Sequence, residues 1–196
     1  MNAFNNTVPV VHHRPYPGST PSYQASIEYA HIDAGMMVPA TTSGAALETK
    51  ETAGSAINYD RLLFDATTAE SAWFKMTLPP HWDRGSFRAL VNWEADSGSG
   101  GVAFGISARA CKDGTVIDSS MGTEVVVTDT LVLAGAAQNS PVFFTITPSG
   151  STDRITEVFF KLRRIPSNAA DTLAVDAGVR SLLLQWVNGS EPRPLS

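Results

Sequence analysis

Two stretches of alternating apolar residues on either side of a Pro-Pro turn constrain the fold most strongly. The apolar positions before the turn are Ala72, Phe74, Met76 and Leu78, and those after it are Phe87, Ala89, Val91 and Trp93. A period of two is typical of strands with one buried face. Pro79 and Pro80 lack the N–H group that a sheet ladder needs, so they end the first strand. The sequence therefore predicts two neighbouring strands, over residues 71–78 and 87–94.

The same alternation continues along the chain and predicts about eight strands in all. The further candidates are residues 58–64, 102–110, 123–128, 131–133, 141–147, 157–165 and 174–186. Residues 157–165 are also compatible with a helix, but alternating β-branched and aromatic side chains favour a strand. Turns rich in Gly, Pro, Ser and Asp separate the strands, without helices between them. This arrangement predicts an all-β fold, an antiparallel jelly-roll β-sandwich.

Residues 1–56 differ from the rest in composition and predict an extended N-terminal arm. The segment is rich in Pro, Thr, Ser, Gly and Ala, and its aromatic side chains are spaced as anchors rather than as a core: Phe4, Tyr16, Tyr23 and Tyr29. Prolines favour an extended, polyproline-like backbone. A disordered tail is the alternative, but an ordered arm without its own core must borrow a neighbour's surface. The sandwich would then occupy residues 57–188, and residues 189–196 would form an exposed tail.

The composition excludes several classes of protein. Charged residues make up 17% of the chain, below the roughly 25% typical of soluble domains, and the net charge is −5. An acidic chain is a poor binder of nucleic acid, because phosphate contacts need an excess of Lys and Arg. The chain lacks both an apolar run of the roughly 20 residues that span a bilayer and the pattern of a signal peptide. We therefore expect no nucleic-acid or membrane partner, and a protein that is made and kept in the cytoplasm of the cell that produces it.

The single cysteine and the one basic cluster are expected to have structural rather than functional roles. Cys111 is the single cysteine, which excludes an internal disulfide and a cysteine-based metal cluster. We expect it to be a small buried hydrophobic side chain. The basic cluster consists of Lys161, Arg163 and Arg164. We expect these side chains on the solvent or interface side of a strand whose other side chains are buried.

The candidate catalytic residues do not form a pattern that selects a reaction. His12 and His13 are adjacent, so they point to opposite sides of an extended chain and cannot share one metal. His81 stands near Asp83 and could act as a general base, but such a residue more often caps a turn. Paired carboxylates for glycoside hydrolysis could come from Glu94, Asp96, Asp113 or Glu124. All four lie at strand ends or in turns, where a carboxylate is usually solvated. The sequence predicts no catalytic residue, no cofactor and no metal site.

The four tryptophans divide into two core candidates and two surface candidates. Trp93 and Trp186 follow the apolar pattern of their strands and are expected in the core. Trp73 lies on the face of its strand opposite Phe74, and Trp82 lies in a turn. We therefore predict that Trp73, His81, Trp82 and Arg84 form part of a subunit interface, with a sugar-binding surface as the alternative.

Residues 58–187 carry four marks that occur together. They are Phe64-Asp65 at a strand end, an aromatic strand running from Trp73 through Leu-Pro to the Trp82 turn, Val91-x-Trp93, and the stretch from Glu157 to Trp186 with its Asp-rich loop. In these marks the chain resembles a β-sandwich domain that recurs in virion proteins of tailed bacteriophages. The resemblance implies a jelly-roll fold and a place on the particle, and it brings no catalytic residues with it.

The resemblance, the predicted arm and the absence of a catalytic pattern together imply a non-enzymatic capsid decoration or cement protein. Its expected partners are the major capsid protein and copies of itself, as a homotrimer on the outer surface of the shell. The arm would tie it to neighbouring subunits. A tail or spike component that binds a host-surface glycan is the alternative, and a glycan-cleaving enzyme ranks last.

Overall fold

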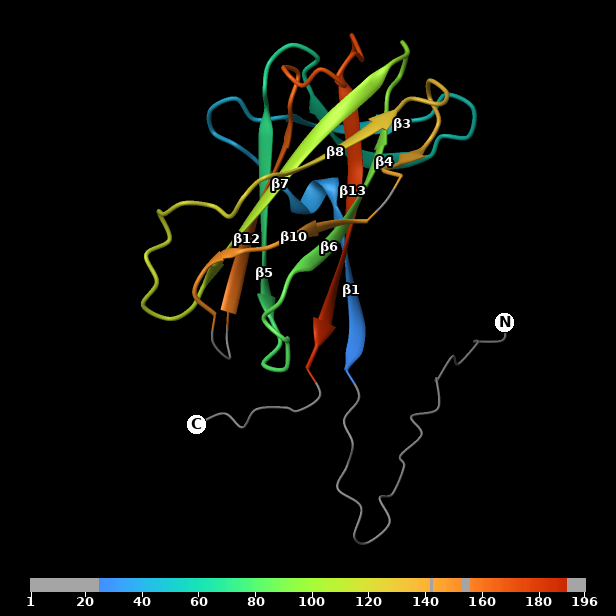
Figure 1. The fold of residues 1–196 in the computed structure, drawn as a ribbon. Coiled ribbons are helices and arrows are strands. Elements are labelled where there is room, and N and C mark those ends of the chain that lie inside the picture. Colours follow the sequence, from blue (N-terminus) through green and yellow to red (C-terminus); the bar gives the residue numbers. More distant parts are fainter. Residues whose placement is uncertain (1–24, 142, 153–155, 190–196) are drawn as a thin grey trace, which may run out of the picture.

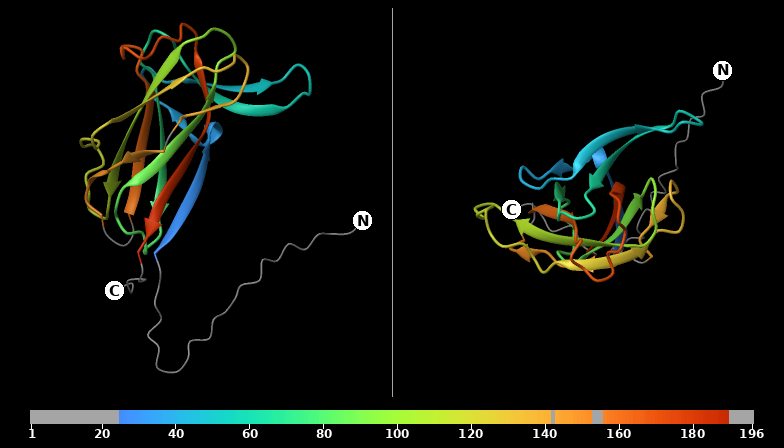
Figure 2. Two further views of the ribbon diagram at one scale, coloured as in Figure 1. Left: turned by 45° about the vertical axis from the view of Figure 1, so that its right-hand side comes forward. Right: turned by 90° about the horizontal axis from the view of Figure 1, so that it is seen from above.

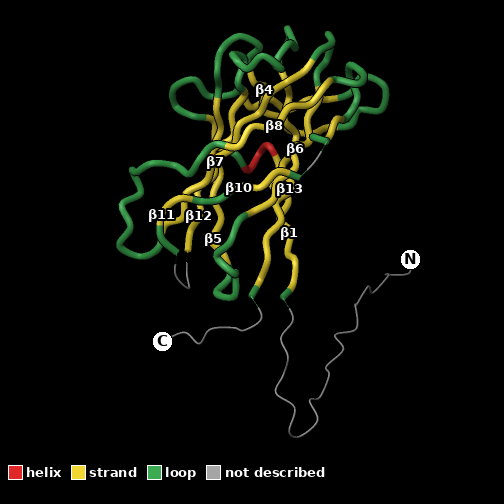
Figure 3. The backbone as a smooth tube through the Cα atoms, in the orientation of Figure 1, coloured by secondary structure: helices red, strands yellow, loops and turns green. Residues whose placement is uncertain are grey.

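The structure is a computed structural model that describes residues 25–141, 143–152 and 156–189, and these form a sandwich of two curled sheets (Figure 1). The seven-stranded sheet A contains β1 (Ser26–Asp33), β3 (Ala46–Glu51), β4 (Asn58–Phe64), β6 (Phe87–Glu94), β9 (Gln138–Asn139), β10 (Phe144–Ile146) and β13 (Ala177–Asn188). The six-stranded sheet B contains β2 (Val38–Pro39), β5 (Ser71–Leu78), β7 (Gly101–Cys111), β8 (Val125–Thr130), β11 (Ser149–Gly150) and β12 (Thr156–Arg164). Figure 3 shows one short 3-10 helix, η1 (Ala34–Met36), among the strands. Within the described ranges, no helix is long and apolar enough to cross a membrane.

The strand order confirms the predicted all-β jelly-roll sandwich. Sheet A runs in the order β10-β6-β13-β4-β3, with β1 paired to β13 and β9 paired to β6. Sheet B runs β11-β7-β12-β5-β2, with β8 paired to β7. The strands predicted at residues 58–64, 71–78 and 87–94 are β4, β5 and β6. Residues 157–165 were open to a helical interpretation, and β12 shows that the strand prediction was correct.

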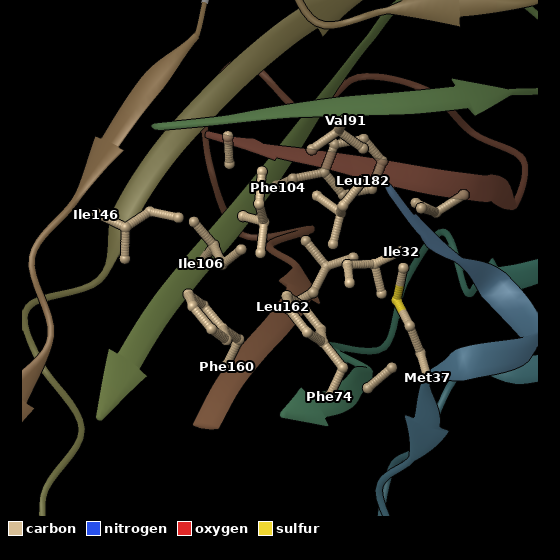
Figure 4. Packing of buried hydrophobic residues seen from close by; sticks show 14 of the residues in the cluster. Ile32, Met37, Phe74, Val91, Phe104, Ile106, Ile146, Phe160, Leu162 and Leu182 are labelled. Carbon is tan, nitrogen blue, oxygen red and sulfur yellow. The ribbon is translucent and has the colours of Figure 1, made fainter. Parts of the chain in front are cut away.

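The core lies between the two sheets and is built by the predicted alternation (Figure 4). On β6 the four apolar positions Phe87, Ala89, Val91 and Trp93 are fully buried. Phe74 of β5 stacks on Phe160 of β12 with ring centroids 4.7 Å apart, and Phe87 meets the same Phe160 ring edge to face at 5.1 Å. Complete burial of a side chain of this size contributes about 1.5–3 kcal/mol.

Strand β7 is buried on both of its faces, which explains its small residues. All residues from Gly101 to Cys111 are buried. A Cβ atom on Gly101 would lie 2.4 Å from the Ala170 carbonyl oxygen, and one on Gly105 would lie 2.6 Å from the Glu124 carboxylate carbon. Loops therefore approach the outer face of β7 closely enough that larger side chains would not fit. Cys111, at the end of this strand, is buried as predicted.

The predicted arm requires a correction from residue 25 onward. Residues 26–33 form β1, which pairs with β13 over eight residue pairs, and residues 46–51 form β3, which pairs with β4. Ile32 and Met37 belong to the core. The weak apolar pattern of this segment reflects strands with one exposed face at the border of a sheet, held by ladder hydrogen bonds rather than by their own apolar content. Residues 1–24 and 190–196 of the predicted arm and tail lie outside the described residues.

The number of strands and one strand position also differ from the prediction. Beyond β1 and β3, the sequence pattern missed the two-residue strands β2, β9 and β11, which are too short to show a period. Residues 131–133, predicted as a strand, form a bend instead. Leu131 is buried there, whereas Val132 is 85% exposed. This loop uses one apolar side chain as an anchor, and its remaining apolar content does not indicate a sheet.

The basic cluster on β12 is divided among three environments, and the prediction was wrong for Arg164. Lys161 lies over the Trp73 ring, and Arg163 forms a bidentate ion pair with Glu124 at 2.6 and 2.7 Å. Arg164 is fully buried, with an ion pair to Asp171 at 2.7 Å. Its guanidinium also donates hydrogen bonds to the carbonyl oxygens of Phe64, Leu173 and Val175. A buried arginine is tolerated because the carboxylate and three carbonyls replace the water that it loses.

Candidate functional site

Strand β13 changes its neighbour within sheet A, and this change opens a notch on the outer face of the sheet. Residues 177–179 of β13 pair with β4, whereas residues 181–188 pair with β1. A register shift between Val179 and Ser181 on the β6 side marks the same point. Figure 2 shows the β3–β4 hairpin projecting from the body of the sandwich beyond this junction. The notch therefore lies where β4 leaves the sheet and β1 takes its place.

Hydrogen-bonding side chains from five strands line this notch, which has a volume of about 610 Å³. The lining residues are His31, Asp33, Tyr59, Asp60, Asn92, Asn139, Arg180 and Ser181. They contribute carboxylate, amide, hydroxyl, imidazole and guanidinium groups, and none is aliphatic. Asn92 donates a hydrogen bond to the Ser181 hydroxyl at 2.9 Å. An open depression of this composition suits a ligand with many hydroxyl or amide groups rather than an apolar one.

A network of charged side chains holds one lining residue of the notch, Tyr59. The Tyr59 hydroxyl donates to both Glu94 carboxylate oxygens at 2.8 Å, and Arg61 donates to the same carboxylate at 2.8 Å. Arg61 also holds Asp96 through two hydrogen bonds of 2.8 Å, and Lys50 binds both Glu94 and Asp96. Glu94 was expected to be solvated at a strand end, but it is buried by this network. The network joins β3, β4 and β6 and so fixes Tyr59 at the notch.

The network sets the protonation of its members. The hydrogen bonds from Arg61 hold the pKa of the Asp96 carboxyl well below its usual range, so Asp96 is charged. Burial, together with the hydrogen bond to Glu94, raises the pKa of the Tyr59 phenol, so Tyr59 stays neutral and donates its proton. Arg180 comes within 3.9 Å of Glu94, yet its buried Nε–H has no hydrogen-bond partner among the described residues. The notch thus presents fixed donors and acceptors to a ligand.

The structure does not bring the predicted interface residues together. Trp73 is half-buried on the outer face of sheet B, whereas Tyr29 lies on β1 in sheet A, 56% exposed, and accepts a hydrogen bond from Gln185. His81 is exposed, and Arg84 is half-buried with a positive φ of 65°. Phe4, Tyr16 and Tyr23, like His12 and His13, lie outside the described residues.

Trp82 is buried, so its assignment to a surface was wrong. The turn that carries it folds back onto the end of β13, where the Asp83 N–H donates to the Val187 carbonyl and the Gly189 N–H donates to the His81 carbonyl. The Trp82 ring then packs on Phe87 with centroids 5.2 Å apart. Trp93 and Trp186 are buried as predicted.

Sequence reasoning missed the notch because its residues come from five strands. His31 and Asp33 lay in the segment predicted as an arm, and no local signal in the sequence indicates that β13 changes partners. Of the carboxylates considered for catalysis, Glu94 and Asp96 meet in the network on Arg61 and Lys50, whereas Glu124 is paired with Arg163 and Asp113 is exposed in a turn. Within residues 25–141, 143–152 and 156–189, no group of three or more His, Cys, Asp or Glu side chains is placed to hold a metal ion.

Comparison with known proteins gives matches at the level of structure. No protein-family model and no curated protein sequence matches the chain. The CBM22-2 xylan-binding domain of Paenibacillus barcinonensis Xyn10C aligns with a TM-score of 0.50 and 13% identity, over 80% of this chain and 98% of that domain. A family 35 carbohydrate-binding module from Clostridium thermocellum has a TM-score of 0.44 and 9% identity, over 80% and 97% of the two chains. A chain of infectious bursal disease virus, Gx strain, has a TM-score of 0.45 and 12% identity, over 92% of this chain and 38% of the viral one.

At an identity this low, the match to the xylan-binding domain bears on the fold alone. It agrees with the two curled sheets around one core. The chain is therefore a jelly-roll β-sandwich, with the fold that a xylan-binding module also has.

Proposed function

We propose that this chain is a non-enzymatic binding protein of a phage particle and that the notch on sheet A holds a glycan of the host surface. The observation that carries the proposal is the convergence of eight hydrogen-bonding side chains in one open depression. The sequence resemblance to virion sandwiches supports its place on the particle. The fold shared with a xylan-binding domain supports the saccharide class.

The chemistry of the lining matches that of a sugar. Each sugar hydroxyl can donate and accept a hydrogen bond, and the notch offers Asn92, Asn139 and Arg180 as donors beside Asp33 and Asp60 as acceptors. The Tyr59 ring and the His31 ring supply flat surfaces. A single hydrogen bond of this kind contributes about 0.5–1.5 kcal/mol, so several must act together. Such a site gives weak individual binding that many copies on one particle would multiply.

The contacts of the nearby carboxylates support binding without catalysis as part of this proposal. A glycosidase needs two carboxylates that face the scissile bond from opposite sides. Glu94 is buried, accepts hydrogen bonds from Tyr59, Arg61 and Lys50, and does not line the notch. Asp33 and Asp60 line the notch, but Asp33 is paired with His31 and Asp60 accepts a hydrogen bond from Thr49.

The experiment is a glycan-binding measurement with matched variants. We expect the full-length protein to show saturable binding to at least one saccharide in a panel that contains bacterial surface polysaccharides and xylohexaose, measured by isothermal titration calorimetry. Asn92→Ala and Arg180→Ala should each weaken binding about two- to tenfold, in line with the loss of one hydrogen bond. Lys75→Ala, an exposed change on sheet B, should leave binding unchanged. Absence of saturable binding across the panel, or binding by both notch variants as tight as that of the unaltered protein, would overturn the proposal.

The second candidate is the capsid decoration or cement role, and the border of sheet A favours it. In the described part of the chain, β1 pairs with β13 alone, so its other edge offers unpaired backbone groups. Ile27 and Tyr29, each 56% exposed, lie beside Val187 on the outer face near this edge. An exposed apolar strand edge is a natural contact for the major capsid protein or for further copies in a homotrimer on the capsid surface.

Copy number and capsid binding separate the two candidates. Decoration requires hundreds of copies per particle, whereas a tail or spike component requires a few or about a dozen, as symmetric assembly dictates. Under decoration, Ile27→Lys should abolish binding to capsids that lack this protein, while Val132→Lys, at a more exposed position far along the chain, should not. A low copy number together with capsid binding that is unaffected by Ile27→Lys would eliminate decoration.

A further inference from the structure

The outer face of sheet A continues beyond the notch along β13 and its two neighbours, β6 and β1 (Figure 1). Side chains two residues apart on a strand point to the same face of the sheet. The strand register places three notch residues, Asp33, Ser181 and Asn92, side by side in one row across the three strands. Two further rows follow on the same face, first His31, Leu183 and Leu90, and then Tyr29, Gln185 and Arg88. We refer to these two rows as the Tyr29 strip.

The row next to the notch supplies a partly apolar floor. Leu183 and Leu90 lie directly opposite each other on β13 and β6, and both are half-buried. The His31 side chain beside them is 55% exposed and already lines the notch. The C–H groups of a sugar ring can pack on such a floor, because this contact removes apolar surface from water. The notch therefore passes into the strip without a change of face.

The far row holds an aromatic ring in a fixed position. Gln185 donates a hydrogen bond to the Tyr29 hydroxyl at 3.0 Å and accepts one from Arg88 at 3.1 Å. Gln185 is only 7% exposed, whereas Tyr29 is 56% exposed. Because its hydroxyl is tied to a buried side chain on the neighbouring strand, the Tyr29 ring leans over β13 and keeps a face open to solvent. Among the described residues, no cation and no second ring stacks on it.

The length of the strip sets the size of a ligand that could use it. Tyr29 is four residues before Asp33 on β1, which places the two side chains about 13 Å apart at about 3.3 Å per residue. One sugar ring is too short to contact both. An aromatic face is electron-rich and attracts the weakly positive C–H groups of a sugar ring. The outer face of sheet A thus offers a polar end and an aromatic end to one extended chain.

We propose that the notch and the Tyr29 strip form one continuous site for a glycan of several sugar units, which lies along β1 and β13 with one unit stacked on Tyr29. This inference rests on the proposed glycan binding by the notch. It names the ligand as a polymer bound along its chain rather than a single sugar or a chain end. Tyr29 is then a second subsite, and the notch residues are the first.

The test is the dependence of affinity on glycan length, measured by isothermal titration calorimetry with the full-length protein. The bacterial surface polysaccharides of the panel are cut by partial acid hydrolysis and separated into disaccharides and long fragments, and xylobiose and xylohexaose form a defined pair. Affinity should rise about three- to tenfold from disaccharide to long fragment, the factor that one added aromatic contact supplies. Tyr29→Ala should remove this rise and leave the affinity for disaccharides unchanged.

Two matched variants separate the ring from its hydroxyl and the strip from the notch. Tyr29→Phe retains the ring and should retain the rise with length. Asn92→Ala should weaken binding of short and long fragments alike, because it changes the notch. The unchanged affinity of Tyr29→Ala for disaccharides serves as the control that the sheet remains folded.

The outcomes distinguish this inference from the proposed function. Affinity that does not rise with length, or equal weakening of short and long fragments by Tyr29→Ala, would overturn the second subsite while binding by the notch stands. A loss in Tyr29→Phe as large as that in Tyr29→Ala would also overturn it, because the ring face would then contribute nothing. Absence of saturable binding by every fragment would overturn the proposed function and the inference together.

Discussion

The side chains on the outer faces of the two sheets are held by different kinds of contact. On sheet A, Arg61 and Glu94 are nearly buried and form an ion pair at 2.8 Å, with further partners on β3 and beyond β6. On sheet B, Trp73 and Phe159 are half-buried under lysine side chains and a loop, and the neighbouring Arg109 keeps an unpaired donor. Each face keeps one buried N–H group without a hydrogen-bond partner among the described residues, Arg180 Nε on sheet A and Arg109 Nε on sheet B. The difference is that charged groups hold one another on sheet A, whereas aromatic rings and cations do so on sheet B.

The largest effect should come from breaking the charge network of sheet A. Arg61→Leu removes the cation that neutralises Glu94 and Asp96, and loss of one member of a buried pair typically costs about 3–5 kcal/mol. Urea unfolding followed by circular dichroism would measure this loss in the free energy of unfolding. Lys75→Ala on sheet B serves as the control and should change that free energy by less than about 0.5 kcal/mol. A loss below about 1 kcal/mol for Arg61→Leu would show that the network does not stabilise sheet A.

Lowering the pH should have a smaller effect on stability, and this effect also involves sheet A. The pKa of Asp96 is lowered from its ordinary value of 3.8 by Arg61, so its contribution to stability is present above about pH 4 and is lost as the pH falls through the native value. Because the side chain is half-exposed, solvent limits this contribution to about 1 kcal/mol or less. Urea unfolding at pH 7, 4 and 2.5 should show the decline.

The comparison with Asp96→Asn isolates this carboxylate. Asp65 titrates in the same window, because hydrogen bonds from Thr67 and Thr68 lower its pKa to about 2. Asp96→Asn should therefore flatten only part of the acid decline. An identical pH dependence in the wild type and in Asp96→Asn would remove Asp96 from the explanation.

The smallest effect should come from the matching ion pair on sheet B. Arg163 and Glu124 form a bidentate pair, but both side chains remain about one-third exposed. Pairs of this kind contribute about 0.2–1 kcal/mol. Glu124→Gln should lower the free energy of unfolding by no more than that, measured by the same urea titration. A loss as large as that of Arg61→Leu would remove the contrast between the two faces.

Much of the sandwich was predictable because its strands are strongly periodic. The alternation in β4, β5, β6 and β12 gave both their positions and their buried faces, since one face of each strand must be apolar to enter the core. Strand β1 was not predictable in this way. Its side chains are mostly exposed, and its place depends on ladder hydrogen bonds with β13, which is more than 140 residues away along the chain.

Two tryptophans and two arginines show the same limit of prediction from sequence for single residues. Trp73 and Trp82 both lacked a core pattern, yet the turn at residues 79–86 folds over the end of β13 and buries Trp82 alone. Arg163 and Arg164 are adjacent and equally charged, yet the pleat of β12 sends the first outward and the second inward to Asp171. Local sequence cannot distinguish such pairs, because the deciding partner belongs to a distant segment.

The sequence by itself determined the class of this protein: alternating apolar residues and turn residues commit it to an all-β sandwich. Period-two strands must bury their apolar faces, and in a chain without helical patterns the layer that covers them is another sheet. The tertiary structure alone decided which side chains from distant segments lie together on the two outer faces. The notch exists because β13 exchanges β4 for β1 at Ser181, and the hollow lined by Trp73, Phe159 and Arg109 exists because the loop between β7 and β8 lies beside three neighbouring strands. Both depend on contacts between residues far apart in the chain, and periodicity carries no information about which distant strands will pair.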